Sequence, residues 1–229
     1  MATQELVQYL SQFVSERRLS LINEVLQNRT KYITVALENI YQPQNASAVL
    51  RTCECLGIQD IHVIENENKY VYNPCVALGA GKWTNLIRYN KPGNNSLHAI
   101  SHLKENGYRI VVTVPEERGI ALDDFDISKG RTAIIIGTEL HGVSETAIAA
   151  ADEFLTIPMY GFTESYNLSV STALILYQLV RKLRTSDIDW HLSDDEITEL
   201  RFSWLKSSIK RPELLIKNFR ENLTLLGHQ

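Results

Sequence analysis

The sequence of 229 residues has no hydrophobic run long enough to cross a bilayer. Its longest apolar stretch, around residues 173–180, falls well short of the roughly 20 residues that a transmembrane helix needs. The N-terminal segment carries Glu5 and has neither a basic start nor a continuous apolar block, so it is unlike a secretory signal. We therefore expect a cytoplasmic protein without a membrane segment.

Cysteine is scarce. Cys53, Cys55 and Cys75 are the only cysteines, and none has the C-x-x-C spacing of many metal and redox sites. Their odd number predicts reduced structural thiols. His98 and His102 have the i, i+4 spacing of a two-histidine metal site on a predicted helix, but no third ligand accompanies them. We therefore expect no bound metal.

The glycine-rich fingerprints of common nucleotide sites are also missing. Gly79-Ala80-Gly81 resembles a fragment of a dinucleotide-binding loop, but Thr84 occupies the place of the third glycine. A tight turn before Trp83 explains these residues better. The sequence contains neither a Walker loop nor a G-x-S-x-G elbow. These absences argue against NAD binding, NTP hydrolysis and α/β-hydrolase chemistry.

The net charge of −4 argues mildly against indiscriminate binding of nucleic acid, because cationic side chains supply most non-specific affinity. A local basic face remains compatible with this charge. Taken alone, each positive cluster is more simply a solvated helix face. The clusters are Arg17 with Arg18, Arg29 with Lys31, Arg181 with Lys182 and Arg184, and Lys206 with Lys210 and Arg211.

Apolar runs alternate with segments of helical periodicity through most of the chain. This alternation predicts an α/β fold with a mostly parallel sheet and helices on both faces. The expected strands are residues 33–37, 61–64, 86–89, 109–114, 133–136 and 154–157.

Both ends of the chain lack strand patterns. Residues 5–27 predict one or two amphipathic helices. Near the other end, Ser193 and Glu196 have the spacing of a capping box, and Pro212 suits the first turn of a last helix. We therefore predict three parts: a helical arm at residues 1–30, an α/β core at 31–184 and a second helical arm at 185–229.

Polar residues gather at three points where a predicted strand gives way to a helix. The segments are LENIYQPQNASAVLRT at residues 37–52, AIIIGTELHGVSE at 133–145, and a loop that opens the helix after Ser165-Tyr166-Asn167. In an open α/β sheet, the carboxyl ends of the strands form the ligand-binding edge. Ser or Asn at a helix start is also an ordinary cap, so one such segment alone decides nothing.

The order N-x-S-A-x-x-R-T, then G-x-E-x-x-G-V-S, then I-P-M-x-G and S-x-N-L-S-V-S resembles the three motifs of the SpoU/TrmH branch of the SPOUT RNA methyltransferases. The resemblance covers residues 32–184. It implies a C-terminal trefoil knot, a homodimer, S-adenosylmethionine as cofactor and methylation of a ribose 2′-hydroxyl. The helical arms resemble those of tRNA enzymes that modify a D-loop guanosine. Ribosomal RNA as substrate, or a non-catalytic RNA-binding protein on the same scaffold, remains an alternative.

The resemblance assigns Arg51 most directly to catalysis, with Asn45 orienting it. A free guanidinium keeps its proton up to roughly pH 12 and is therefore a poor base at neutral pH. We expect Arg51 instead to hold a phosphate and the reacting hydroxyl in place. Gln44 stands where several tRNA enzymes carry histidine, and Tyr166 where leucine is usual, which leaves the particular RNA open.

By the same resemblance, the catalytic residues are Asn45, Arg51, Glu139, Ser165 and Asn167; the cofactor-binding residues are Thr113, Gly137, Ile157, Met159 and Tyr166; and the RNA-binding residues are Arg17, Arg18, Arg29 and Arg181.

Overall fold

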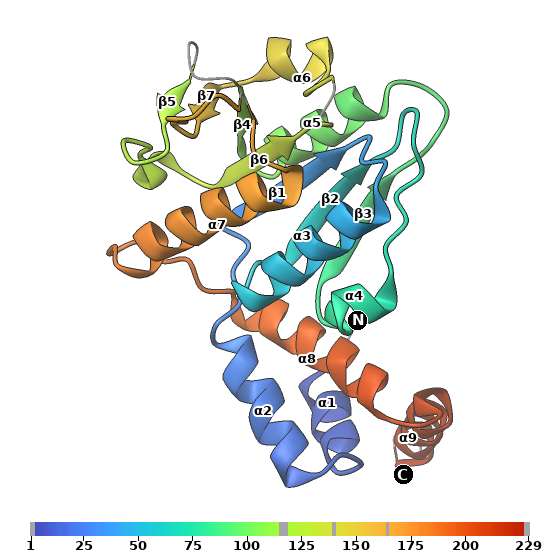
Figure 1. The fold of residues 1–229 in the computed structure, drawn as a ribbon. Helices are drawn as coiled ribbons and strands as arrows, with labels where there is room; N and C mark the ends of the chain where they lie inside the picture. The colour runs from blue at the N-terminus through green and yellow to red at the C-terminus, as the bar shows by residue number, and fades with distance from the viewer. Residues whose placement is uncertain (1–2, 115–118, 139–140, 164, 227–229) are drawn as a thin grey trace. The chain divides into compact units, whose positions relative to one another are not determined.

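A computed structural model of the chain describes residues 3–114, 119–138, 141–163 and 165–226 (Figure 1). The chain divides into two compact units. Residues 30–190 form an α/β unit, and residues 1–29 with 191–229 form a helical unit. Residues 185–190, which we expected in the second arm, belong to the α/β unit. The reason is packing, because Ile188 and Trp190 lie half-buried against its core and the Thr30 hydroxyl donates to the Trp190 carbonyl at 2.7 Å.

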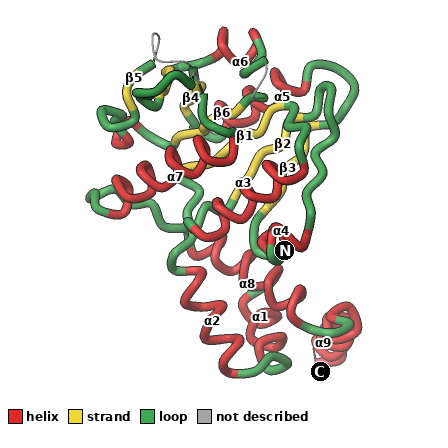
Figure 2. The backbone as a smooth tube through the Cα atoms, viewed as in Figure 1, coloured by secondary structure: helices red, strands yellow, loops and turns green. Residues whose placement is uncertain are grey.

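The α/β unit contains a seven-stranded sheet in the order β3-β2-β1-β6-β4-β7-β5, and every pairing is parallel. The strands are β1 (Ile33–Glu38), β2 (Asp60–Ile64), β3 (Asn85–Tyr89), β4 (Arg109–Thr113), β5 (Ile120–Ala121), β6 (Thr132–Ile136) and β7 (Glu153–Thr156). All six expected strands are confirmed, and β5 is an addition. Figure 2 shows the strands as one layer with helices around it.

Two apolar clusters cover the two faces of the sheet. Within β1, Val35 and Leu37 belong to one cluster and Ala36 to the other, as the two-residue period of a strand requires. Helices α3 (Pro43–Cys55) and α7 (Leu168–Arg184) pack together on the first face (Figure 1). Helices α5 (Asn95–Glu105) and α6 (Glu145–Ala150) pack on the second. The predicted fold class is therefore confirmed.

Shorter elements complete the α/β unit. Helix α4 (Pro74–Ala77) is followed by the 3₁₀ turn η1 (Ala80–Lys82), and a second 3₁₀ turn, η3 (Ile127–Lys129), precedes β6. Gly79 has φ +84°, so the expected tight turn before Trp83 is present. Cys53 is buried as expected, whereas Cys55 and Cys75 are exposed.

Strand order brings the three motif segments to one edge of the sheet. The segments follow β1, β6 and β7, and all strands run parallel, so their carboxyl ends share that edge. Strands β1 and β6 are neighbours, and only β4 separates β6 from β7. From β1 the chain winds outward to β2 and β3 and then returns on the other side, which makes this edge a topological switch point.

The helical unit contains α1 (Gln4–Ser11), α2 (Glu16–Leu26), α8 (Asp194–Ser208) and α9 (Pro212–Leu226). Helices α1 and α2 both contact α8. The capping box at the start of α8 is confirmed, because the Glu196 N–H donates to the Ser193 hydroxyl and the Ser193 N–H donates to the Glu196 carboxylate. Among the described residues, no helix combines the length and apolar character that a bilayer span requires.

Arg29 corrects one expectation. Its side chain is 1% exposed, and its guanidinium lies 5.1 Å from the ring centroid of Trp204 on α8. A guanidinium held there is out of reach of a phosphate. Arg29 is therefore part of the core of the helical unit and not an RNA contact.

A half-buried tyrosine hydroxyl joins two histidines in the α/β unit. The Tyr89 oxygen lies 2.8 Å from His62 Nδ1 and 2.6 Å from His102 Nδ1. Because a hydroxyl has one hydrogen, Tyr89 can donate to only one of the two rings, and at least one histidine donates to it. Burial, with a smaller contribution from His102, lowers the pKa of His62 to about 4. Burial, with a contribution from Asp60, raises the pKa of Tyr89 to about 12.

The low pKa of His62 predicts a loss of stability in mild acid. Between pH 6.5 and about 4, His62 binds a proton in the unfolded chain but stays neutral in the folded one. The free energy of unfolding therefore decreases as the pH is lowered through that window. The loss reaches on the order of 3 kcal/mol at its lower end. Urea unfolding at several pH values measures it. The His62→Gln variant should lose less over the same window than wild type or the surface control His98→Gln, and equal slopes would contradict the assignment.

Candidate active site

The first motif forms the start of α3. Pro43 occupies its first turn, where its missing N–H costs no hydrogen bond. Asn45 is 5% exposed, and its amide nitrogen donates to Gln42 Oε1 at 3.2 Å. Arg51 lies two turns further along on an exposed stripe with Gln44. Within the described part of the chain, its guanidinium makes no hydrogen bond or ion pair.

The third motif forms the start of α7. Asn167 caps this helix, and its side-chain oxygen accepts hydrogen bonds from the N–H and hydroxyl of Ser169 at 2.9 and 2.6 Å. Its amide nitrogen donates to Asn45 Oδ1 at 3.2 Å. This bond joins two motif residues that are far apart in the chain, and α3 packs against α7 beside it.

The described residues of the second motif, 137–138 and 141–144, follow β6. The Thr138 N–H donates to the Gly142 carbonyl at 2.8 Å, and the Gly142 N–H donates to the Thr138 carbonyl at 2.9 Å. Gly142 has φ +65°. Gly137 is buried against the same carbonyl, and a Cβ there would overlap it. Both glycines are therefore required by the fold of the loop. Glu139 lies outside the described residues.

The remaining predicted cofactor residues lie at the ends of β4 and β7. Thr113 ends β4, and its hydroxyl donates to the Ile135 carbonyl at 3.3 Å. Ile157 and Met159 follow β7 and are half-buried. Tyr166 is 42% exposed, and Ser165 beside it is exposed. The structure thus joins Asn45 to Asn167 directly and puts Thr113, Gly137 and Ile157 at the ends of the neighbouring strands β4, β6 and β7.

Sequence reasoning missed Glu38. It is the last residue of β1 and only 2% exposed. Its carboxylate accepts hydrogen bonds from the N–H and the hydroxyl of Ser144, which caps α6 directly after the second motif. It also accepts one from the Ser96 hydroxyl on α5. The only sequence signal was a carboxylate at the end of an otherwise apolar strand.

A sequence profile of the SpoU rRNA Methylase family matches residues 32–177 of the chain. The chain belongs to this family. The assignment confirms the resemblance found in the order of the motifs.

Two individual proteins are similar to this chain over most of its length. A tRNA (guanosine(18)-2′-O)-methyltransferase of Borreliella burgdorferi is 43% identical over 206 residues, which cover 90% of this chain and 92% of that protein. The crystal structure of the A. aeolicus TrmH/SpoU tRNA modifying enzyme has a TM-score of 0.75 and 29% identity, and the match covers 86% of this chain and 98% of that one.

The SpoU methyltransferase AviRb from Streptomyces viridochromogenes, crystallised with the cofactor AdoMet, has a TM-score of 0.59 and 24% identity, over 71% of this chain and 65% of its own. This likeness shows a shared fold.

This SpoU family member exposes large apolar side chains around its third motif. Val170, Leu174 and Tyr177 are 45%, 41% and 58% exposed, and their spacing puts them on one stripe of α7. Tyr160 and Phe162, in the loop before the helix, are 97% and 109% exposed. An exposed apolar stripe such as the one on α7 is typical of an interaction surface.

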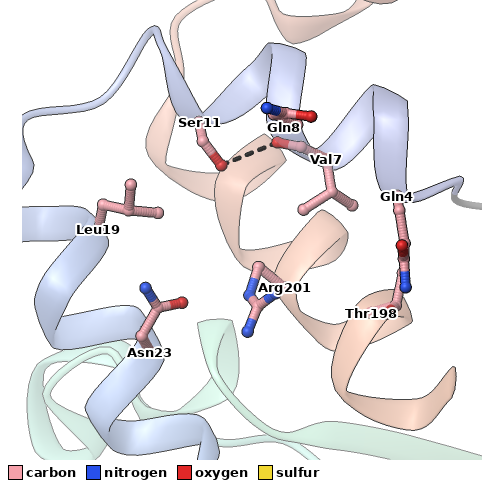
Figure 3. Close-up of a pocket in the computed structure, with 8 residues that line it drawn as sticks. All are labelled: Gln4, Val7, Gln8, Ser11, Leu19, Asn23, Thr198 and Arg201. Atoms are coloured by element: carbon pink, nitrogen blue, oxygen red, sulfur yellow. Dashed lines mark hydrogen bonds between the residues drawn. The ribbon is translucent and has the colours of Figure 1, made fainter. Parts of the chain in front are cut away.

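The helical unit contains a pocket of about 510 Å³ between α1, α2 and α8 (Figure 3). Arg201 of α8 extends toward α1 and α2, with Asn23 of α2 beside it, as Figure 3 shows. The buried Arg201 Nε has no hydrogen-bond partner among the described residues. Amide, hydroxyl and aliphatic groups complete the lining, from Gln4, Val7, Gln8, Ser11, Leu19 and Thr198.

Proposed function

We propose that this chain is an S-adenosylmethionine-dependent methyltransferase that methylates the ribose 2′-hydroxyl of guanosine 18 in tRNA. One observation supports the proposal most strongly: the Asn167-to-Asn45 hydrogen bond links the first and third motifs at the sheet edge where the second motif also lies. The chain is also 43% identical to a tRNA (guanosine(18)-2′-O)-methyltransferase over 90% of its length.

The residues at the ends of β6 and β7 fit a bound S-adenosylmethionine. Thr156, the last residue of β7, is 4% exposed, and its hydroxyl has no hydrogen-bond partner among the described residues. Such a group costs free energy unless a ligand or water satisfies it. Backbone groups at Gly137 and at residues 157–159, with the side chains of Thr113 and Tyr166, would hold the cofactor. The cofactor supplies an electrophilic methyl group on a sulfonium.

In the proposed mechanism, the protein holds the ribose oxygen in line with that methyl group, which can lower the barrier by several kcal/mol. The exposed Arg51, without an acidic partner in the described residues, is free to pair with a phosphate of the RNA. The guanidinium would also donate to the reacting hydroxyl oxygen and so stabilise it as its proton passes to a phosphate oxygen of the RNA. Asn45, Ser165 and Asn167 would orient the ribose and the cofactor. Glu139 is proposed as a further catalytic residue, as the family resemblance implies.

A homodimer would cover the apolar stripe on α7. The stripe adjoins the third motif, so a second copy seated there would reach the same site and could complete it. Light scattering should give twice the chain mass, and Leu174→Glu should shift the protein toward a monomer that has lost activity. We also propose that the C-terminal part of the α/β unit forms the trefoil knot that the family resemblance implies.

The RNA contacts proposed for Arg17, Arg18 and Arg181 agree with their exposure on α2 and α7. We add Arg201 of the helical unit to these proposed RNA contacts. Its guanidinium lies in a pocket with three side-chain amides and has no acidic partner among the described residues, so a phosphate could pair with it.

Neutralising these arginines should weaken tRNA binding. We expect Arg17→Gln/Arg18→Gln to raise the Kd for tRNA and to reduce the dependence of log Kd on log salt by about one unit for each phosphate that is no longer paired. Arg201→Gln should act in the same direction. Filter binding at several salt concentrations measures both, with Arg88→Gln, an exposed arginine paired to Glu65, as the control. Salt slopes equal to the control would rule out these phosphate pairs.

Methyl transfer from labelled S-adenosylmethionine tests the function itself. The substrates are a tRNA transcript, the same transcript with guanosine 18 replaced by 2′-deoxyguanosine, and ribosomal RNA. We expect label only in the first. Label in ribosomal RNA alone would favour the alternative substrate, and RNA binding without label or heat of cofactor binding would favour the non-catalytic alternative.

A further inference from the structure

We infer that Glu38 is a positioning residue that fixes the end of the second-motif loop, at residues 141–144, relative to the first motif. This role rests on the proposed function, because the loop is a proposed part of the cofactor site. No other described carboxylate joins the three structural elements involved: the end of β1, the start of α5 and the start of α6.

The strand period explains why this side chain points to the loop. Leu37 faces the apolar cluster beneath α3 and α7, so Glu38 faces the opposite side, with α5 and α6. The next residue, Asn39, has φ +56°, and its side-chain oxygen accepts hydrogen bonds from the N–H groups of Asn66 and Glu67 at 2.9 and 3.0 Å. Glu38 thus sits between a buried strand and a fixed turn.

The carboxylate uses both oxygens as acceptors. The Ser144 N–H donates to Oε2 at 2.7 Å, and the Ser144 hydroxyl donates to Oε1 at 2.7 Å. The Ser96 hydroxyl donates to Oε1 as well, while its oxygen accepts from the Asn66 amide at 2.8 Å. The carboxylate is buried and has no cationic partner among the described side chains, so these donors compensate its lost hydration.

The end of the loop is therefore anchored to β1. Gly137 follows β6 directly, and Ser144 joins the other end of the loop to β1 through Glu38. The Ser144 hydroxyl also accepts from the Ala147 N–H at 3.2 Å, so the same bond orients the first turn of α6. Because β1 continues directly into the first motif, Glu38 couples the position of that motif to the position of the second.

Replacing Glu38 by glutamine tests the coupling with almost no change in volume. The amide has one acceptor oxygen, so the donors from Ser144 and Ser96 compete for it. We expect the Kd for S-adenosylmethionine to rise and kcat to fall, each about tenfold, because displacements near 1 Å at a reacting centre can cost up to about 10²-fold. The KM for tRNA should stay within about twofold of the wild-type value, because the helical unit is untouched. Calorimetry and steady-state kinetics measure these quantities.

Glu65→Gln is the matched control. The Glu65 side chain is 6% exposed, and its carboxylate accepts hydrogen bonds from the Tyr70 N–H at 2.6 Å and from Arg88 at 3.3 Å, with no link to the second motif. We expect this variant to lose thermal stability and to keep the wild-type cofactor affinity and kcat. If the two variants share the same Kd, kcat and melting temperature, Glu38 has only a structural role and the inference is wrong.

Hydrogen–deuterium exchange separates this inference from the proposed function. In Glu38→Gln, peptides covering residues 137–147 should exchange faster than in wild type, whereas peptides from β3 should not change. If wild type neither binds S-adenosylmethionine nor methylates tRNA, the proposed function fails and exchange alone decides the inference. Unchanged exchange at residues 137–147 would overturn it in either case.

Discussion

Replacing Arg51 by alanine is expected to lower kcat for methyl transfer by about 10²- to 10⁴-fold, the range typical for loss of a group that assists proton transfer or stabilises charge. The cofactor affinity should stay near the wild-type value. The reason is that Arg51 is exposed on α3, whereas the proposed cofactor contacts lie at the ends of β4, β6 and β7. Single-turnover methyl transfer into tRNA, together with calorimetry of cofactor binding, measures the two effects separately.

Two further variants sharpen this test. Arg51→Lys keeps the charge but loses the planar fork that can hold a phosphate and a hydroxyl together, so its kcat should fall between those of wild type and alanine. Cys55→Ala changes an exposed residue one turn further along the same helix and should have wild-type kcat. An unchanged kcat in Arg51→Ala would remove the proposed catalytic role, and equal losses in Arg51→Ala and Cys55→Ala would indicate damage to α3.

Local pattern was enough to predict the strands that build the site. In β1 and β6, continuous apolar runs are what a parallel sheet buried on both faces requires, and both strands have every residue buried. The same reasoning failed for β5, which has only two residues and depends on its neighbour. A Cβ at Gly119, just before β5, would lie 2.8 Å from the backbone nitrogen of Thr156, so this strand is defined by close approach to β7.

Side-chain roles depended on partners that no local pattern reveals. The sequence suggests a surface cation at Arg29, whereas in the structure its guanidinium packs over the Trp204 ring. The sequence shows Glu38 only as the last residue of a strand, whereas in the structure Ser144 and Ser96 donate hydrogen bonds to its carboxylate. The hydrogen bond between Asn45 and Asn167 likewise depends on the packing of α3 against α7. Sequence thus predicted which segments meet at this sheet edge, while tertiary packing determined which of their polar groups stay exposed.

Replacing Gly137 by alanine is expected to abolish cofactor binding and to lower kcat/KM by at least about 10²-fold, because the loop backbone must move away from its present position. The added Cβ would overlap the Gly142 carbonyl, which the Thr138 N–H already holds at 2.8 Å. A rigid acceptor cannot yield as a flexible side chain would, so we also expect a loss of about 1–3 kcal/mol in the free energy of unfolding. Calorimetry with S-adenosylmethionine and urea unfolding measure the two losses.

Gly161→Ala is the control for this change, because it adds the same methyl group to another motif glycine, the last residue of I-P-M-x-G, without a clash. The nearest heavy atom to a Cβ there is the Thr163 nitrogen at 4.0 Å, an ordinary contact. This variant should keep its cofactor affinity and stability. If Gly137→Ala instead bound S-adenosylmethionine as tightly as Gly161→Ala, the second-motif loop would not form part of the cofactor site. The convergence of the three motifs would then have to be explained by packing alone.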